Sequence, residues 1–332
     1  MQTHQNFEIA GSGVYFPQCR VEAEEIDASL GKPQGWTRQH VGVLTRYECR
    51  EPETSVSMAK IAVMRAMENA VMKWSDIDLV IDCSTTIHRL IPCNGAHIQA
   101  AFGNEAAGIP AFDVQSTCLG FIVGLNVANA FFATGVYRSI MLVCSETPSL
   151  AANPHEPESA ALLGDAAVAV ILRHRNDSEK PFFFAHETWG EYLDTCIIEG
   201  GATAIPSYDY TPDKFDAFRF HMDGPAVFKA AIKRLPPMVR RLFEQANINP
   251  SDLCVLPHQA SPKANELIRR MLKFTPEQYH GGVVEHGNLV AAGIPVLLHR
   301  VREERLFSQN QPIMLLGTSA GYSQAALIFY GN

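Results

Sequence analysis

The sequence has no C-x-x-C pair and no short-range cluster of cysteine and histidine, although it contains 8 cysteines and 12 histidines. Structural zinc sites and disulfide frameworks depend on such spacings. We therefore expect no metal, no other cofactor, no disulfide scaffold, and a reducing, cytoplasmic environment.

The chain also lacks an excess of basic residues. Its 27 Lys and Arg against 35 Asp and Glu give a net charge of −8, which disfavours broad nucleic-acid binding. We expect no membrane span, because no apolar run reaches the roughly 18 residues that one needs. The first 17 residues lack the basic and apolar regions of a secretory signal.

Short apolar runs of strand type alternate with longer helical patterns. Strands are predicted at 7–17, 78–86, 111–114, 139–146, 166–174, 253–258, 312–318 and 325–331, and helices at 55–74, 119–135, 224–235, 238–247, 263–273 and 291–305. The series restarts in the second half, and 332 residues exceed the usual size of a single core. We expect an α/β protein of two related halves, 1–174 and 175–332, with an irregular excursion at about 175–220.

The segment FDVQSTCLGF places Cys118 where a strand gives way to a helix. The N-terminus of a helix presents free N–H groups and the positive end of its dipole, and both favour a thiolate. A packed small hydrophobe is the alternative, because free cysteine is among the most buried residue types. Position alone does not decide between a nucleophile and a core residue.

Two later segments offer partners for this cysteine. His258 in LPHQAS follows a predicted strand, and Asn288 in EHGNLVAAGIP lies in a Gly-containing turn before a helix. Ends of buried strands are where open α/β sheets usually place functional groups. Separately, His258 could be a satisfied core histidine and Asn288 a helix N-cap. Together with Cys118 they indicate a nucleophile with two polar partners.

Seven segments in order resemble the β-ketoacyl-acyl-carrier-protein synthase III family of thiolase-fold condensing enzymes. They are GWTRQHVGV, FDVQSTCLGF, LLGDAAVAVIL, FHMDGPAVFKAA, LPHQAS, EHGNLVAAGIP and LLGTSAGYSQAAL. The resemblance covers almost the whole chain and implies a thiolase-like fold with the layers α-β-α-β-α. It also implies that Cys118, His258 and Asn288 are the catalytic triad.

The resemblance implies an acyl-enzyme on Cys118, with backbone N–H groups of Cys118 and Ala320 as the oxyanion site. A malonyl thioester would then lose CO2 and attack the acyl group, with His258 and Asn288 donating to the enolate oxygen. One alternative is a related acyltransferase that passes the acyl group to an alcohol, amine or thiol without decarboxylation. A second is a non-catalytic subunit of a heteromeric synthase. GTSAG has no second cysteine, which disfavours reversible thiolysis.

Substrate contacts implied by the resemblance are Trp36, Ile91, Phe228 and Lys263. Trp36 would stack on the adenine of coenzyme A, although a partly buried surface aromatic is the alternative. Ile91 stands where many members have phenylalanine at the partner subunit's acyl tunnel, which suggests a medium-length or branched acyl group in a homodimer. Core packing is the alternative for Ile91.

Three positions depart from the family pattern. His40, Pro157 and Pro225 replace two arginines and an asparagine that contact coenzyme A in the family. Loss of guanidinium groups should weaken phosphate and adenine recognition. We therefore expect that an acyl-carrier protein, rather than free acyl-CoA, could deliver both substrates.

A basic helix face is implied as the docking site for that acidic carrier. It consists of Arg269, Arg270 and Lys273 in ELIRRMLK. Charge complementarity would speed encounter with a carrier. A solvated basic face is the alternative.

Overall fold

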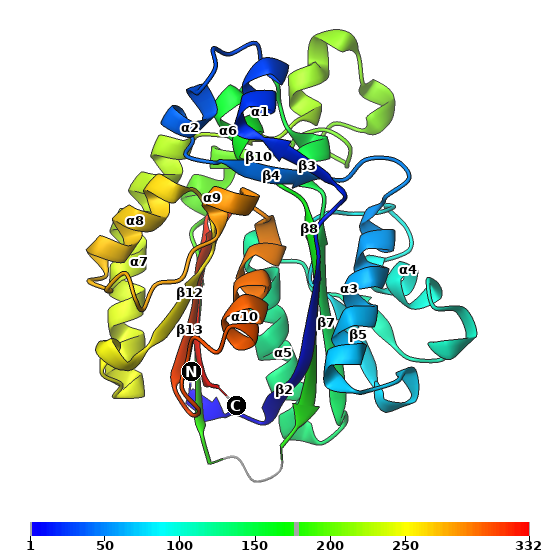
Figure 1. Ribbon diagram of the computed structural model, residues 1–332, viewed down its shortest axis with the longest axis vertical. Coiled ribbons are helices and arrows are strands. Elements are labelled where there is room, and N and C mark those ends of the chain that lie inside the picture. The colour runs from blue at the N-terminus through cyan, green and yellow to red at the C-terminus, as the bar shows by residue number, and fades with distance from the viewer. Residues whose placement is uncertain (1, 176–178, 332) are drawn as a thin grey trace.

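Two five-stranded sheets form the centre of the protein. The computed structural model describes residues 2–175 and 179–331, so residues 176–178 of the predicted excursion lie outside the described residues. The strand order is β2-β8-β7-β5-β6 in the first sheet and β1-β9-β14-β13-β12 in the second. The sheets lie face to face with helices between them and outside them (Figure 1).

The strands of the first sheet are β2 (Phe7–Tyr15), β5 (Leu79–Asp82), β6 (Ala111–Asp113), β7 (Ser139–Glu146) and β8 (Ala166–His174). Those of the second are β1 (Gln2–His4), β9 (Pro181–Thr188), β12 (Cys254–Pro257), β13 (Pro312–Ser319) and β14 (Ser323–Tyr330). Two short ladders pair β3 (Cys19–Glu22) with β4 (Thr45–Glu48) and β10 (Cys196–Ile197) with β11 (His221–Met222).

Four strands of each sheet repeat the same pattern. In β2-β8-β7-β5 the successive pairs are antiparallel, antiparallel and parallel, and β9-β14-β13-β12 has the same sequence of pairings. This repetition explains why the strand and helix series restarts along the chain. β1 adds to the second sheet beside β9, although it comes from the N-terminal end of the chain.

Three layers of helices complete the fold. α5 (Gly120–Thr134) and α10 (Gly293–Glu303) lie between the sheets, and each contacts strands of both. The outer layers are α3 (Ser55–Ala70) with α4 (Asn94–Ala100), and α7 (Gly224–Ala246) with α8 (Pro262–Met271). The short helices are α1 (Ala23–Ser29), α2 (Trp36–His40), α6 (Pro157–Leu162) and α9 (Val283–His286). The layers are therefore α-β-α-β-α, as expected.

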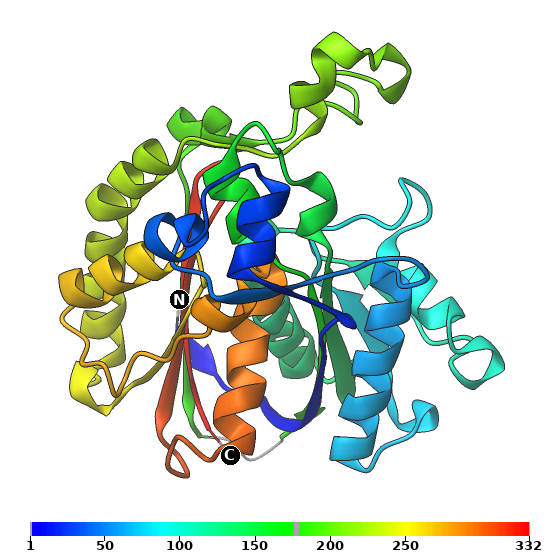
Figure 2. The same ribbon diagram turned by 45° about the horizontal axis from the view of Figure 1, so that its top comes forward.

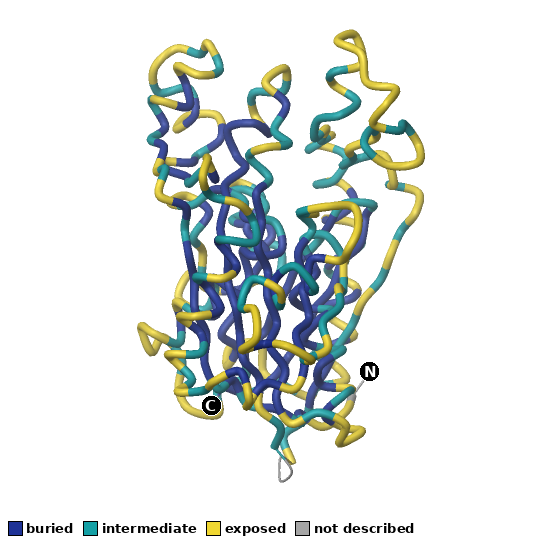
Figure 3. Tube along the Cα trace, turned by 90° about the vertical axis from the view of Figure 1, so that its right-hand side faces the viewer, coloured by how far each residue is buried: buried dark blue, intermediate teal, exposed yellow. Residues whose placement is uncertain are grey.

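Coverage on both faces explains the near-continuous apolar strands. Every residue of β7 is buried, because α3 packs on one face of that sheet and α5 on the other. Figure 3 shows buried residues concentrated in the sheets and the central layer, with exposed residues at the tips of the molecule.

One helix among the described residues has the length and composition of a membrane span. The window Thr117–Thr134, which includes all of α5, is 18 residues long with a mean hydropathy of 1.5. Half of the window is buried inside the protein. Its place between the two sheets accounts for its composition, because a helix in the central layer packs apolar side chains against both sheets.

Two predictions from local pattern were wrong. The helices expected at 224–235 and 238–247 form one helix, α7, which continues through Pro236 and Pro237. Its apolar face packs against the second sheet on both sides of the prolines, and Gln324 donates a hydrogen bond to the carbonyl of Arg234 there. Within the excursion expected at 175–220, β9 is a full strand that pairs with β14. The rest includes an arm around 200–220 that projects from the body (Figure 2).

The start of α5 lies unusually close to β5. A Cβ added at Gly120 would stand 2.0 Å from the carbonyl oxygen of Cys83, which follows β5. We expect Gly120→Ala to lower the free energy of unfolding by about 1–3 kcal/mol or more, because overpacking forces the helix away from the strand. Chemical denaturation measures this. Gly190→Ala is the control, since no atom lies within 4 Å of its added Cβ; equal stability of both variants would contradict the close packing.

Candidate active site

Cys118 lies in the short 3-10 turn η3 (Thr117–Leu119), directly before α5. Thr117 has a φ of 46°, a left-handed conformation that is uncommon for a β-branched residue. Such strain is tolerated when the surroundings fix it, and it occurs often at functional sites. Cys118 is partly exposed, whereas Leu119 is fully buried, so the turn is anchored in the core with its cysteine at the edge.

Gly317 of β13 joins this turn to His258. A Cβ added at Gly317 would stand 2.9 Å from Leu119 Cδ2 and 3.1 Å from His258 Cβ. The absent side chain therefore allows the nucleophile turn and the histidine to lie against the same point of β13. The structure thus brings the turn that contains Cys118 and the residue His258, which are far apart in the sequence, to the same strand.

His258 follows β12 and continues its pairing with β13. Its N–H donates to the carbonyl of Leu316 at 2.7 Å, and the residue is 6% exposed. Burial lowers the pKa of His258 to about 4, so the ring is neutral at physiological pH. Its Nδ1 is buried and has no hydrogen-bond partner among the described residues.

Asn288 is held by backbone and side-chain bonds in the turn before α10. Its N–H donates to the carbonyl of Leu162, and its carbonyl accepts from Gly164. Its Oδ1 accepts from the N–H of Val290 at 2.9 Å, while its Nδ2 donates to the carbonyl of Ala260 at 3.3 Å. Since Ala260 is two residues beyond His258, the amide group lies beside the histidine loop with a second N–H still to donate.

The pKa of the Cys118 thiol is shifted by burial and by neighbouring groups. Burial raises the pKa of the thiol well above its usual range, and the charge of Glu146 raises it further, followed by that of Cys196. Hydrogen bonds from the backbone N–H groups of Cys118 and Ala320 act in the opposite direction. The helix start was expected to favour a thiolate, but burial outweighs that effect in the free protein.

Glu146 was not recognised from the sequence. It ends β7 with no exposed area and accepts bonds from the N–H groups of Thr85 at 2.6 Å and Thr86 at 2.9 Å, and from the Thr86 hydroxyl at 2.7 Å. Burial raises its pKa to about 7, although those bonds and one from the backbone of Ala291 lower it. A charged residue closing an otherwise apolar strand is the signal that could have identified it.

Trp36, His40 and Lys263 meet at the end of the molecule that carries α2 and α8. The rings of Trp36 and His40 stack with centroids 5.0 Å apart at 17°, and Lys263 Nζ donates to the carbonyl of His40 at 2.8 Å. Lys32 Nζ lies 5.2 Å from the Trp36 ring centroid. One face of the tryptophan is therefore already covered by the chain's own imidazole.

The remaining predicted residues lie in different places. Phe228 is half-buried in the first turns of α7. Ile91 is 85% exposed on the loop between β5 and α4, where Ile87 and Leu90 are also exposed. Pro157 and Pro225 stand at the first turns of α6 and α7.

The predicted docking residues divide into two kinds. The side chain of Arg269 is 16% exposed and is held by Glu266 and by the carbonyl of Phe274. Arg270, which also pairs with Glu266, is 70% exposed, and Lys273 is exposed just beyond α8. Arg270 and Lys273 therefore form the accessible part of this basic face.

No group of three or more His, Cys, Asp or Glu within residues 2–175 and 179–331 could hold a metal ion. The site consists of a thiol, an imidazole, a carboxamide and backbone N–H groups. These groups can form a covalent acyl intermediate and donate hydrogen bonds to developing negative charge.

The chain is similar to known proteins over nearly its full length. The family model described as 3-oxoacyl-[acyl-carrier-protein (ACP)] synthase III matches residues 112–188, and the model of its C-terminal part matches residues 243–330. A β-ketoacyl-[acyl-carrier-protein] synthase III from Neisseria gonorrhoeae is 28% identical over 98% of this chain and 99% of the relative.

Solved structures agree with these matches. The 3-oxoacyl-(acyl carrier protein) synthase III of Pseudomonas aeruginosa is 26% identical with a TM-score of 0.86, over 98% of both chains. OleA from Xanthomonas campestris, solved with bound lauric acid and lauroyl-CoA, shares the fold at 19% identity, with a TM-score of 0.83 over 99% of this chain and 100% of that one.

We expect alkylation of Cys118 by iodoacetamide to be slow at pH 7 and to keep rising through pH 9, because the raised pKa keeps the thiol protonated. Glu146→Gln removes a negative charge beside the sulfur and should speed alkylation at pH 8 by about threefold or more. Mass spectrometry of the Cys118 peptide measures both, with Cys118→Ala as the blank. Rapid alkylation that is already maximal at pH 7 would contradict the buried, neutral thiol.

Proposed function

We propose that this chain is a β-ketoacyl-acyl-carrier-protein synthase III-like condensing enzyme of the thiolase superfamily, in which Cys118, His258 and Asn288 carry out a decarboxylative Claisen condensation. The product is a β-ketoacyl thioester in fatty-acid or specialised-metabolite synthesis. One observation above all supports this assignment: Leu119, next to Cys118, and His258 both pack against Gly317.

In the first step Cys118 takes the acyl group from a thioester donor. A bond forms between its sulfur and the acyl carbon, the donor's C–S bond breaks, and the released thiol carries the proton away. The N–H groups of Cys118 and Ala320 hold the oxyanion of the tetrahedral intermediate. Each such donor typically contributes about 3–4 kcal/mol to lowering the barrier.

In the second step a malonyl thioester occupies the place of the departed thiol. His258 and Asn288 each donate an N–H to its thioester oxygen, which stabilises the enolate formed as CO2 leaves. The carbanion then forms a C–C bond to the acyl carbon, and the bond to Cys118 breaks. A neutral imidazole suits this role, because His258 stays uncharged with its pKa lowered to about 4.

Carrier-protein delivery fits the mouth of the site better than free coenzyme A. His40 covers one face of Trp36, and Lys263 contacts the carbonyl of His40. Prolines 157 and 225 offer no side-chain hydrogen bond to a nucleotide. We propose that a carrier brings the malonyl group and also the acyl donor, with Phe228 lining the path of the phosphopantetheine arm, and that no metal or other cofactor takes part.

We also propose a cytoplasmic homodimer. Ile87, Leu90 and Ile91 are 58%, 74% and 85% exposed on one loop, an apolar surface that a second copy would cover. Ile91 would then reach the partner's acyl site and leave more room than an aromatic residue. The two halves 1–174 and 175–332 would serve as the units that contribute the nucleophile and the donors.

Intact mass tests the nucleophile and the donor together. We expect incubation with acyl-carrier-protein or acyl-CoA donors of two to twelve carbons to add a mass that follows the chain length and disappears in Cys118→Ala. Labelled malonyl carrier protein should then release CO2 and form a β-ketoacyl product. Acyl-enzyme without CO2 release would favour plain acyl transfer to another acceptor. No acylation by any donor would leave only the non-catalytic subunit.

Reversing the charge of Arg270 and Lys273, the accessible part of the basic face, tests carrier docking. The double variant Arg270→Glu/Lys273→Glu should raise the KM for carrier-borne substrate by about tenfold at low salt, with kcat and the use of acyl-CoA unchanged, because steering depends on charge complementarity. Lys60→Glu/Lys73→Glu, which are exposed in and just after α3 in the opposite outer layer, form the matched control. An equal effect of both double variants would contradict a docking site on α8.

A further inference from the structure

We propose that Tyr279, acting through one buried water, holds His258 as the tautomer whose Nδ1 accepts a hydrogen bond and whose Nε2 carries the proton. The proposal rests on the condensing function above, since that reaction needs a donor N–H on the histidine. Tyr279 is then a positioning residue, because it acts on the substrate only through His258.

The unpartnered Nδ1 of His258 is the first observation. A neutral imidazole has one nitrogen that donates and one that accepts, and the bond at one nitrogen decides which of them carries the proton. Nδ1 is buried and bonds to no described residue. Buried polar atoms nearly always have a partner, either protein or ordered water.

A small cavity supplies room for that partner. It measures about 10 Å³ and is lined by His258 and Thr318 from the strand ends, by Tyr279, and by apolar side chains that include Leu235 and Ile268. About 10–15 Å³ is the space that one water requires, provided that two or more polar groups face it. The cavity is therefore of the size for a single water.

Tyr279 also lines this cavity, and its hydroxyl is buried and bonds to no described residue. Burial raises the pKa of Tyr279 above its usual range, so the phenol keeps its proton. A phenol proton needs an acceptor, and a water in this cavity can accept it. When that water donates one of its own protons to Nδ1 of His258, the ring proton stays on Nε2, which is the arrangement that the donor role of His258 in the condensation requires.

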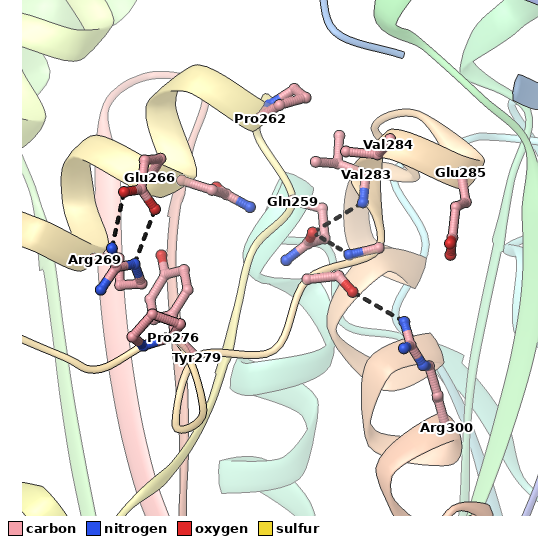
Figure 4. Close-up of a pocket in the computed structure, with 13 residues that line it drawn as sticks. Gln259, Pro262, Glu266, Arg269, Pro276, Tyr279, Val283, Val284, Glu285 and Arg300 are labelled. Carbon is pink, nitrogen blue, oxygen red and sulfur yellow. Dashed lines mark hydrogen bonds and ion pairs between the residues drawn. The ribbon is translucent and has the colours of Figure 1, made fainter. Parts of the chain in front are cut away.

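Tyr279 also connects the cavity to the surface. It lines a larger pocket of about 400 Å³ between α8, α9 and the last turn of α10, where Figure 4 shows its ring beside the Glu266–Arg269 pair. Asn265 lines the same pocket, is 7% exposed, and has both side-chain polar atoms buried without a partner in the described chain. Asn265 in the larger pocket and His258 at the small cavity both have buried polar atoms without a partner in the described chain, and Tyr279 lines both spaces. This arrangement indicates a short line of ordered waters that leads inward to His258.

Tyr279→Phe tests the proposal, because it removes one hydroxyl and leaves the ring. In the 15N-histidine-labelled protein we expect His258 Nδ1 to resonate in the unprotonated range and to move toward the protonated range in this variant. His258→Gln identifies the signal among the 12 histidines. Tyr208→Phe, on the exposed arm, is the matched control and should change neither the tautomer nor the rates.

The partial reactions provide the second readout. CO2 release by the acyl-loaded variant should fall about tenfold, while acylation of Cys118 stays within about twofold, because only the second step needs the Nε2–H. A protonated Nδ1 in the wild-type protein, or an unchanged tautomer and rate in Tyr279→Phe, would overturn the proposal. If the wild-type protein releases no CO2 while Tyr279→Phe still shifts the tautomer of His258 as expected, the condensing function is overturned and the role of Tyr279 stands.

Discussion

The close approach at Gly317 is the constraint on which the rest of the site depends. Leu119 and His258 both press on this one position of β13, and a single methyl group would stand about 3 Å from each. The duplicated sheets create the arrangement. β5 and β12 occupy equivalent places, and α5 and α10 begin at the same end of the central layer. Under the proposed mechanism, Cys118 comes from one half of the chain, and His258 and Asn288 come from the other.

Burial also determines the electrostatic character of the site. Desolvation raises the pKa of Cys118 and Glu146 and lowers that of His258, so each of these three groups is pushed toward its uncharged form. A site whose side chains favour their uncharged forms suits a reaction in which negative charge appears only briefly, first on a carbonyl oxygen and then on an enolate. Fixed N–H donors can stabilise that charge without attracting water into the site in the resting state. The start of α5 thus contributes the backbone N–H of Cys118 rather than a permanently ionised thiol.

Much of the fold could be predicted because its strands are covered on both faces. β7 and β8 begin and end at the residues expected, since unbroken apolar runs leave little ambiguity. Where long-range packing overrides local conformational preference, the predictions from the sequence were wrong. Pro236 and Pro237 predict a break, yet the apolar stripe of α7 stays in phase across them. β9 looks irregular because its identity depends on β14, which lies far along the chain. Glu146 escaped notice for the same reason, since its partners Thr85 and Thr86 belong to another strand end.

The centre and the mouth of the site face different physical demands. Groups around Cys118 must lie at the positions where negative charge develops in the reaction. Few other side chains could therefore replace the thiol, the imidazole or the amide. Recognition at the mouth needs only affinity, which several surfaces can supply. Here His40 stacks on Trp36 and Lys263 binds the backbone of His40, so the chain satisfies these groups internally. A substrate that enters must then gain its affinity elsewhere, and a carrier protein held at Arg270 and Lys273 can provide it at a distance from the reacting atoms.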